Sequence, residues 1–303
     1  MELAIKIENL SKDYPGRHAL TNVSFSVKKG SIHGFLGPNG AGKSTTMKII
    51  SGLIPASSGN FEIFGKVGFL PEHPPVYPNM NVRDYLKFIL AIYSSEKSLP
   101  AAGTLERVME KTGLSDVKDR LIGNLSKGYQ QRVGIAQAII HSPEIIILDE
   151  PTVGLDPVAI AEIRALILEL KKDHTILFSS HQLHDVELLC SDITLINHGE
   201  IVVSGKLEEI LSSLKTNMSS KARVLNFNEQ KSQEMLATFS PDLESISYEA
   251  DPEQKNYLVS MVTKGKKDLR TELTKFLAHF EIGLLEFITE RGDLEDLFKR
   301  MEK

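Results

Sequence analysis

The pattern of apolar and polar residues predicts alternating strands and helices over most of the chain. Residues 3–8 (LAIKIE) alternate apolar and polar side chains as a half-buried strand does, and residues 24–30 (SFSVKKG) repeat this pattern. The apolar runs at residues 144–151 (EIIILDEP) and 174–181 (HTILFSSH) are typical of strands buried on both faces of a parallel sheet. A helical stretch at residues 158–172 lies between these runs and indicates a βαβ crossover. An α/β fold with a mainly parallel sheet is therefore predicted.

A predicted helical subdomain at about residues 76–143 interrupts this alternation. Apolar residues recur there at three- and four-residue spacing in residues 82–93 (VRDYLKFILAIY) and in residues 105–113 (LERVMEKTG). Further along, residues 193–205 (ITLINHGEIVVSG) predict a hairpin with His-Gly at its centre, and residues 207–214 predict a short closing helix. We expect this first domain to span residues 1–215.

The polar, basic and small residues at 213–222 (SLKTNMSSKA) predict a linker into a second domain, at residues 222–303. The pattern beyond the linker predicts a strand, helix, strand, strand, helix and strand, followed by a last helix. This βαββαβ order is typical of a small α+β domain with a ferredoxin-like arrangement. The predicted elements are residues 223–228, 229–239, 242–250, 256–264, 266–280, 282–291 and 293–301.

Composition and charge narrow the possible partners. The chain has 303 residues, enough for two domains, and its 41% hydrophobic and 25% charged residues are typical of folded globular proteins. A net charge of -5 favours neither nucleic acid nor an anionic membrane surface as a direct partner. No apolar run approaches the roughly 18 residues of a membrane span, so a cytoplasmic protein is expected. The single cysteine, Cys190, excludes an internal disulfide and is interpreted as a buried structural thiol.

A glycine-rich motif at residues 37–44 (GPNGAGKS) lies between a predicted strand and a predicted helix. Such a loop binds phosphate because glycines let backbone N–H groups converge on the anion, and the helix N-terminus adds a favourable dipole. Lys43 is expected to reach the β- and γ-phosphates, and the Ser44 hydroxyl to bind Mg²⁺. The predicted nucleotide contacts are Gly37, Pro38, Asn39, Gly40, Ala41, Gly42, Lys43, Ser44 and Thr45.

An acidic pair, Asp149 and Glu150, ends one of the predicted buried strands. Successive side chains of a strand point to opposite sides, so the two carboxylates need not share a task. Asp149 suits the Mg²⁺ shell, and Glu150 can act as the general base that polarises an attacking water. Such a pair is weak evidence alone, but beside a phosphate loop it indicates hydrolysis of a nucleoside triphosphate.

Residues 125–140 (LSKGYQQRVGIAQAII) resemble the signature sequence of ABC ATPases, and the resemblance extends over about residues 3–212. It implies an ATP-binding subunit of an ABC transporter, with a P-loop core, an antiparallel β subdomain and an inserted helical subdomain. In this family the signature of one subunit covers the γ-phosphate of ATP bound to the other subunit. The resemblance assigns that task to the Ser126 hydroxyl and the Gly128 backbone N–H, and implies a dimer, with identical chains expected. The alternative for Ser126 is an ordinary helix cap.

The resemblance also implies roles for three further residues. Tyr14 takes the place of the aromatic residue that stacks on adenine, although a tyrosine packed on the sheet is the alternative. Asp156, in GLDP, corresponds to the D-loop aspartate that couples the two ATP sites. His181 corresponds to the switch histidine, which contacts the γ-phosphate and holds Glu150 and the water in place.

The chain departs from the family pattern in two places. Residues 67–72 (VGFLPE) carry Glu72 where the family usually has glutamine, which puts a carboxylate near Mg²⁺, the water and the phosphates. We therefore expect Glu72 to be a catalytic and metal-binding residue, and hydrolysis to be Mg²⁺-dependent and slow. Residues 57–72 are shorter than in relatives between Gly65 and Val67, which predicts a trimmed antiparallel subdomain beside the adenine.

Residues 70–86 (LPEHPPVYPNMNVRDYL) and the ending at residues 293–301 (DLEDLFKRM) resemble bacterial subunits that pair with exporter permeases. The resemblance implies a membrane permease as partner and a peripheral position on the cytoplasmic face of the membrane. A non-transport ABC ATPase that acts on a macromolecular complex is the alternative, as is a nucleotide-dependent regulatory module. For the second domain, a stabilising or dimerising role without a substrate remains the alternative.

Overall fold

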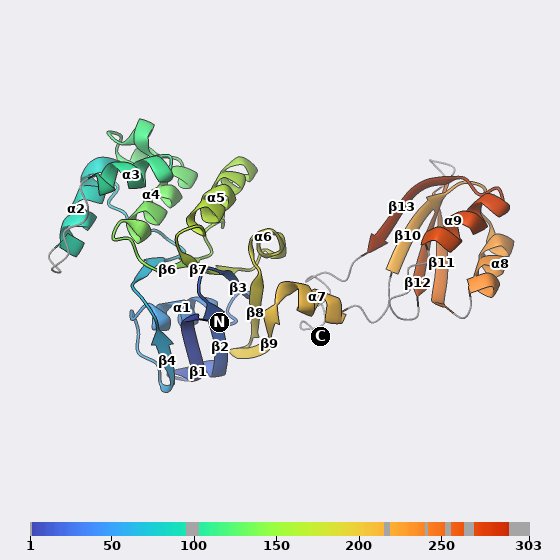
Figure 1. Cartoon of the computed structure of the whole chain (residues 1–303), viewed down its shortest axis with the longest axis horizontal. Coiled ribbons are helices and arrows are strands. Elements are labelled where there is room, and N and C mark those ends of the chain that lie inside the picture. The colour runs from blue at the N-terminus through green and yellow to red at the C-terminus, as the bar shows by residue number, and fades with distance from the viewer. Residues whose placement is uncertain are drawn as a thin grey trace. The chain divides into compact units, whose positions relative to one another are not determined.

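The computed structural model of the chain describes residues 2–94, 103–214, 219–239, 242–251, 256–263 and 270–290. It divides into two compact units, Met1–Leu207 and Glu208–Lys303, which are described separately (Figure 1).

The first unit is built on a six-stranded sheet with the strand order β5-β6-β7-β3-β8-β9. Neighbouring strands are parallel except for β9, which runs antiparallel to β8. Every residue of β3, β6 and β7 is buried, because helices and the second sheet cover both faces. This arrangement confirms the predicted mainly parallel α/β core. The strands are β3 (Ile32–Leu36), β5 (Val67–Leu70), β6 (Ile145–Asp149), β7 (Thr175–Ser180), β8 (Asp192–Asn197) and β9 (Glu200–Lys206).

A second, antiparallel sheet has the strand order β2-β1-β4. Its strands are β1 (Leu3–Tyr14), β2 (Arg17–Lys28) and β4 (Ser58–Ile63). Alternate side chains of β1 and β2, among them Ile5 and Val23, enter the same apolar core as Phe35 and Ile147. The antiparallel subdomain is therefore anchored on the parallel sheet, and three residues, 64–66, connect β4 to β5.

Helices complete the first unit. In Figure 1, α2, α3 and α4 gather at one end of the unit, away from α1 and the antiparallel sheet. The predicted inserted helical region is present, and two short 3₁₀ turns, Ser115–Val117 and Ile122–Asn124, connect α3 to α4. The helices are α1 (Lys43–Ile50), α2 (Val82–Ser94), α3 (Thr104–Lys111), α4 (Lys127–Ile139), α5 (Pro157–Leu170) and α6 (Leu183–Leu189).

The second unit has the predicted βαββαβ order. Its antiparallel sheet has the strand order β11-β12-β10-β13, and α8 and α9 supply side chains to its apolar core, including Met235 and Phe276. After α7 (Leu207–Leu214) come β10 (Ser219–Val224), α8 (Glu229–Phe239), β11 (Leu243–Asp251), β12 (Asn256–Thr263), α9 (Arg270–His279) and β13 (Leu284–Glu290). The predicted last helix, at residues 293–301, lies outside the described residues.

The predicted start of this unit was wrong. We expected a linker over residues 213–222 and a strand from Arg223, but β10 begins at Ser219 and ends at Val224. β10 pairs with both β12 and β13, so it is an inner strand of the sheet. The sequence did not predict the first residues of this strand, because they are polar. Only alternate positions of the strand, such as Ala222 and Val224, enter the core.

Two further expectations concern the single cysteine and possible membrane spans. Cys190 is buried, as predicted, and burial raises the pKa of its thiol. Among the described residues, no helix is long and apolar enough to cross a membrane.

The inner strand β6 offers a direct test of the core. Ile147 is fully buried, so Ile147→Ala removes apolar contacts that its neighbours cannot replace. The variant should lower the free energy of unfolding by about 2–5 kcal/mol in a denaturant titration. The matched variant Val202→Ala, on β9, removes a side chain that is 48% exposed and should change it by less than about 0.5 kcal/mol. Equal losses in the two variants would contradict this description of the core.

Candidate nucleotide-hydrolysing site

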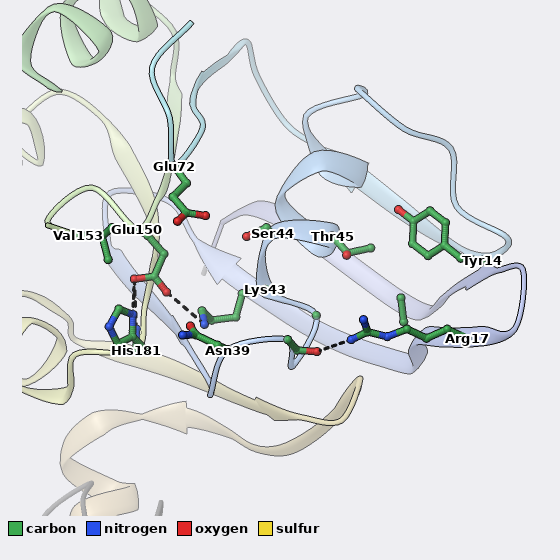
Figure 2. A pocket seen from close by; sticks show the side chains of 13 residues that line it. Tyr14, Arg17, Asn39, Lys43, Ser44, Thr45, Glu72, Glu150, Val153 and His181 are labelled. Carbon is green, nitrogen blue, oxygen red and sulfur yellow. Dashed lines mark hydrogen bonds and ion pairs between the residues drawn. The ribbon is translucent and has the colours of Figure 1, made fainter. Parts of the chain in front are cut away.

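The candidate site lies where neighbouring parallel strands end at one edge of the six-stranded sheet. The glycine-rich loop follows β3, Glu150 follows β6, His181 follows β7, and Glu72 lies two residues beyond β5. Their side chains face a shared cavity of about 530 Å³, a volume typical of small-molecule sites (Figure 2). The cavity is lined by Tyr14, Arg17, Ala19, Asn39, Gly40, Gly42, Lys43, Ser44, Thr45, Glu72, Glu150, Val153 and His181.

The backbone of the loop depends on its glycines. Gly40 and Gly42 have φ angles of 80° and 110°, in the region that side chains with a Cβ rarely adopt. At Gly37, a Cβ would lie only 2.3 Å from the carbonyl oxygen of Ile196. The loop leads directly into α1, whose first turn carries no acidic residue, so its backbone N–H groups and helix dipole favour an anion. The arrangement fits a phosphate group.

Lys43 is held at the centre of the site. Its ammonium donates hydrogen bonds to the carbonyl oxygens of Gly37, at 2.8 Å, and Pro38, at 3.2 Å. It also forms an ion pair with Glu150, with 3.1 Å between Nζ and Oε1. Only 5% of the Lys43 surface is exposed. A buried cation that faces the cavity suits an anionic ligand such as a phosphate.

Glu150 and His181 contact each other directly across the ends of β6 and β7. The Nδ1 atom of His181 lies 2.8 Å from Oε2 of Glu150. A dashed line marks this contact in Figure 2. The backbone N–H of Glu150 donates to the Ser179 hydroxyl at 2.9 Å. Glu150 has a φ of 50°, an uncommon value for a residue other than glycine, so the surrounding contacts must hold its backbone. The carboxylate thus has a fixed orientation between a histidine and a lysine.

Asp149 lies behind this pair and does not border the cavity. Its side chain is 1% exposed and accepts a hydrogen bond from the Ser179 hydroxyl at 2.6 Å. Burial raises the pKa of Asp149, and the nearby charges of Glu150 and Glu72 raise it further, whereas hydrogen bonds from Ser179 and Ser44 act in the opposite direction. A bound cation would relieve this accumulation of negative charge.

The predicted Mg²⁺ ligands supply the oxygen atoms that this ion prefers. Ser44 and Glu72 border the cavity, and Ser44 also hydrogen-bonds Asp149 behind it. Among the described residues, no group of three or more His, Cys, Asp or Glu side chains is close enough to hold a metal ion unaided. Mg²⁺ commonly binds through one or two carboxylates together with substrate phosphates and water, so this donor set fits a nucleotide-bound Mg²⁺.

The rim of the cavity contains one predicted and one unpredicted residue. Tyr14 borders the cavity, is 44% exposed, and has the ammonium of Lys12 5.2 Å from its ring centroid. Arg17 was not predicted, yet it borders the same cavity and donates from Nη2 to the Gly40 carbonyl at 3.0 Å (Figure 2). Arg17 pairs with Tyr14 across the hairpin between β1 and β2. Two smaller lining residues, Ala19 and Val153, were also missed.

The three residues that the resemblance assigns to the dimer do not border the cavity in the single chain. Ser126 caps α4 by accepting a hydrogen bond from the backbone of Tyr129 at 3.4 Å, and Gly128 packs closely on Ala159. Asp156 caps α5 by accepting from the Ala159 N–H at 2.9 Å. The loop residues Gly37, Pro38 and Ala41 also lie outside the cavity lining.

The fold and this site together define a P-loop nucleoside triphosphatase. Residues 20–153 match the family described as ABC transporter. The ABC transporter ATP-binding protein YxlF of Bacillus subtilis is 32% identical, over 98% of this chain and 99% of the relative. The lantibiotic transport ATP-binding protein SrtF of Streptococcus pyogenes is 38% identical, over 69% of this chain and 96% of the relative.

Solved structures agree with this assignment. Cassette cbiO1 of Clostridium perfringens, part of the transporter complex cbiONQ, is 27% identical, with a TM-score of 0.62 over 70% of this chain and 92% of its own. The cassette MJ1267, solved in its ADP conformation, is 28% identical, with a TM-score of 0.61 over 69% of this chain and 93% of its own. The chain belongs to the ATP-binding proteins of ABC transporters, and it binds and hydrolyses ATP.

The raised pKa of Asp149 leads to a prediction about stability. Because burial disfavours its charged form, the stability of the folded protein falls as the pH rises from the unfolded pKa of Asp149 to its folded pKa. Asp149→Asn removes the charge and keeps an oxygen that can accept from Ser179. Its melting temperature without Mg²⁺ should exceed that of the wild type at pH 7, while its Mg²⁺-dependent ATPase activity is lost. A lower melting temperature at pH 7 would contradict the prediction.

Proposed function

We propose that this chain is the motor subunit of an exporter-type ABC transporter, in which two copies bind two ATP molecules at their interface and drive a separate permease. The dimer would lie on the cytoplasmic face of the membrane. ATP binding would close the dimer, and hydrolysis with phosphate release would reopen it.

One observation carries the dimer part of this proposal. Ser126 and Gly128, which the family places over the γ-phosphate, are absent from the cavity that Lys43, Glu150 and His181 border. They lie at the start of α4, where the first turn has no acidic residue and the helix dipole favours an anion. A second copy can supply this helix end to the phosphate. In support, MJ0796, a bacterial ABC transporter cassette solved as a dimer, is 26% identical, with a TM-score of 0.60.

The residues of the cavity suit an in-line attack of water on the γ-phosphate. Lys43 would neutralise phosphate charge, and this would release it from the loop carbonyls and from Glu150. Glu150 would then orient the water and accept its proton, while His181 holds the carboxylate. When Mg²⁺ is bound, it neutralises charge on the phosphates, and Ser44, Asp149 and Glu72 are the residues that would hold it.

Three further residues would bind the adenine, hold the phosphate loop and connect the two subunits. Tyr14, at the rim of the cavity, would stack on the adenine, and Arg17 would keep the loop in place through Gly40. Asp156 would couple the two ATP sites across the dimer.

Permease coupling is supported by the segment that follows Glu72. Pro74, Pro75 and Pro78 restrict its backbone. Tyr77, within this segment, is 52% exposed, and Phe88, on the following helix α2, is 43% exposed, with their ring centroids 6.0 Å apart. Exposed aromatic side chains on a stiff segment suit the docking of a short helix from a permease.

The export direction is supported by the names of relatives. The bacitracin transport ATP-binding protein BcrA of Bacillus licheniformis is 39% identical, over 69% of this chain and 70% of its own. A linearmycin resistance ATP-binding protein of Bacillus subtilis is 34% identical, over 74% of this chain and 76% of its own. Bacitracin transport and linearmycin resistance are tasks that export of an antimicrobial compound would serve, and export is the direction proposed for this chain.

The dimer proposal predicts the behaviour of Glu150→Gln. The amide keeps the size of the side chain but cannot accept the proton, so ATP should bind without being hydrolysed. Size-exclusion chromatography with ATP and Mg²⁺ should show a stable dimer with two bound ATP molecules. Lys43→Ala is the control and should remain monomeric, because it loses the phosphate contact. A monomeric Glu150→Gln protein that binds ATP would contradict the dimer.

The carboxylate at Glu72 predicts a change in metal dependence. Glu72→Gln removes a negative charge from the site and so reduces repulsion of the triphosphate. We expect faster ATP turnover and a different Mg²⁺ concentration for half-maximal rate, both measured by phosphate release. Glu72→Asp is the control that keeps the charge. Equal turnover and equal Mg²⁺ dependence in Glu72→Gln and the wild type would show that Glu72 does not tune the site.

A further inference from the structure

Asp185, on α6, is a fully buried carboxylate that joins two other segments of the first unit. Its side chain has no exposed surface. Its Oδ2 accepts a hydrogen bond from the Thr152 hydroxyl at 2.6 Å, and its Oδ1 accepts one from Nε of Arg164 at 2.8 Å. The Nη2 atom of Arg164 also contacts Oδ1, so the guanidinium binds the carboxylate through two nitrogens.

The partners of Asp185 come from the segment that carries Glu150. Thr152 lies two residues after Glu150, in the turn between β6 and α5, and it is 1% exposed. Arg164 lies on α5, which follows the same turn. Asp185 lies four residues after His181, at the start of α6. The carboxylate therefore connects the segment after Glu150 with the segment after His181.

The turn at Glu150 needs such an anchor. The φ of 50° at Glu150 is a strained value, and strain of this kind costs about 1–3 kcal/mol and persists only where the surroundings enforce it. The near side of the turn is held by the Glu150 N–H, which donates to the hydroxyl and the carbonyl of Ser179, and by the hydrogen bond from Val153 N–H to the Glu150 carbonyl. The bond from Thr152 to Asp185 holds its far side.

A buried ion pair is a poor source of stability. Removing two charges from water opposes folding, and apolar residues of similar volume often stabilise a protein equally well or better. The contacts do give a fixed geometry, because Arg164 donates to Oδ1 from two nitrogens while the Thr152 hydroxyl donates to Oδ2, so both carboxylate oxygens are held. This geometry is valuable here, because a single carboxylate oxygen of Glu150, Oε2, makes both contacts with His181, at 2.8 Å to the ring and at 3.4 Å to the backbone N–H.

We propose that Asp185 is a positioning residue for ATP hydrolysis, which holds the Glu150 turn and the His181 segment in register through Thr152 and Arg164. This inference rests on the roles proposed above for Glu150 and His181. Displacement of a catalytic group by about 1 Å can slow a reaction roughly 100-fold. Loss of the Asp185 contacts should therefore act on turnover and leave the binding of ATP intact.

Thr152→Val gives the sharpest test, because it removes one hydroxyl and keeps the shape of the side chain. In the full-length protein, we expect kcat for ATP hydrolysis to fall roughly tenfold or more, with the KM for ATP within about twofold of the wild type. Thr152→Ser keeps the hydroxyl and should restore most of the turnover. Asp185→Asn should show the same separation of kcat from KM, provided that melting curves show a folded protein.

A matched control separates positioning from stability. Thr194, on β8, is also fully buried, and its hydroxyl contacts His33 of β3 at 2.8 Å and Ser204 of β9 at 2.7 Å. Thr194→Val should lower the melting temperature about as much as Thr152→Val and leave kcat of the folded protein unchanged.

The outcomes distinguish this inference from the proposed function. If Glu150→Gln abolishes turnover while Thr152→Val keeps the wild-type kcat, the positioning role of Asp185 is refuted and the role of Glu150 stands. A rise in KM with unchanged kcat for Thr152→Val would also overturn the inference. If Glu150→Gln retains full turnover, the proposed general base is wrong, and the inference that depends on it falls with it.

Discussion

The site depends on the register of the parallel strands whose ends meet at one edge of the main sheet. Leu70 of β5 is paired with Leu148 of β6, and Asp149 is paired with Ser179 of β7. Leu36 of β3 is paired with Ser180 in the same sheet. Because backbone hydrogen bonds fix these pairs, the segments that carry Glu72, Glu150, His181 and the phosphate loop leave the sheet side by side. A shift of one residue in any strand would turn its functional side chain to the other face.

Because these segments meet, several charged side chains lie close together and largely buried. Some of them are neutralised by a neighbour and one is not. Lys43 forms an ion pair with Glu150, whose other carboxylate oxygen contacts His181. Asp149 forms no ion pair with the residues that the structure describes, and burial raises the pKa of its carboxyl. The strained backbone of Glu150 is a second cost to the stability of the folded protein. The site therefore holds groups that oppose folding, and the ATP phosphates and a metal ion would supply the missing partners.

The sequence predicted the parts of this arrangement that depend on local patterns. The phosphate loop is a continuous motif, and the buried strands β6 and β7 are continuous apolar runs, so both could be found without a structure. Contacts between distant segments could not. Arg17 reaches the loop only because the hairpin of β1 and β2 places it opposite Tyr14. Asp185 lies 33 residues from Thr152 along the chain, and no local pattern connects them.

The position predicted for β10 was wrong, and the sequence left the roles of Ser126 and Asp156 undecided, for different physical reasons. β10 was expected four residues further along, because a strand with one open face resembles a polar linker in sequence. Ser126 and Asp156 cap helices within the chain, and the resemblance assigned them a task in a dimer. A serine or aspartate at a helix N-terminus satisfies both interpretations, so the sequence and a single chain leave the dimer role as a prediction.

In the proposed dimer, each ATP site combines the phosphate loop of one chain with the α4 N-terminus of another. Mixing two inactive variants, Lys43→Ala and Ser126→Arg, tests this arrangement. A mixed dimer then contains one site with an intact loop from one chain and an intact signature from the other. Each variant alone should lack ATPase activity, and mixing should restore part of it. Full activity of Ser126→Arg alone, or no recovery in mixed dimers that demonstrably form, would contradict the arrangement.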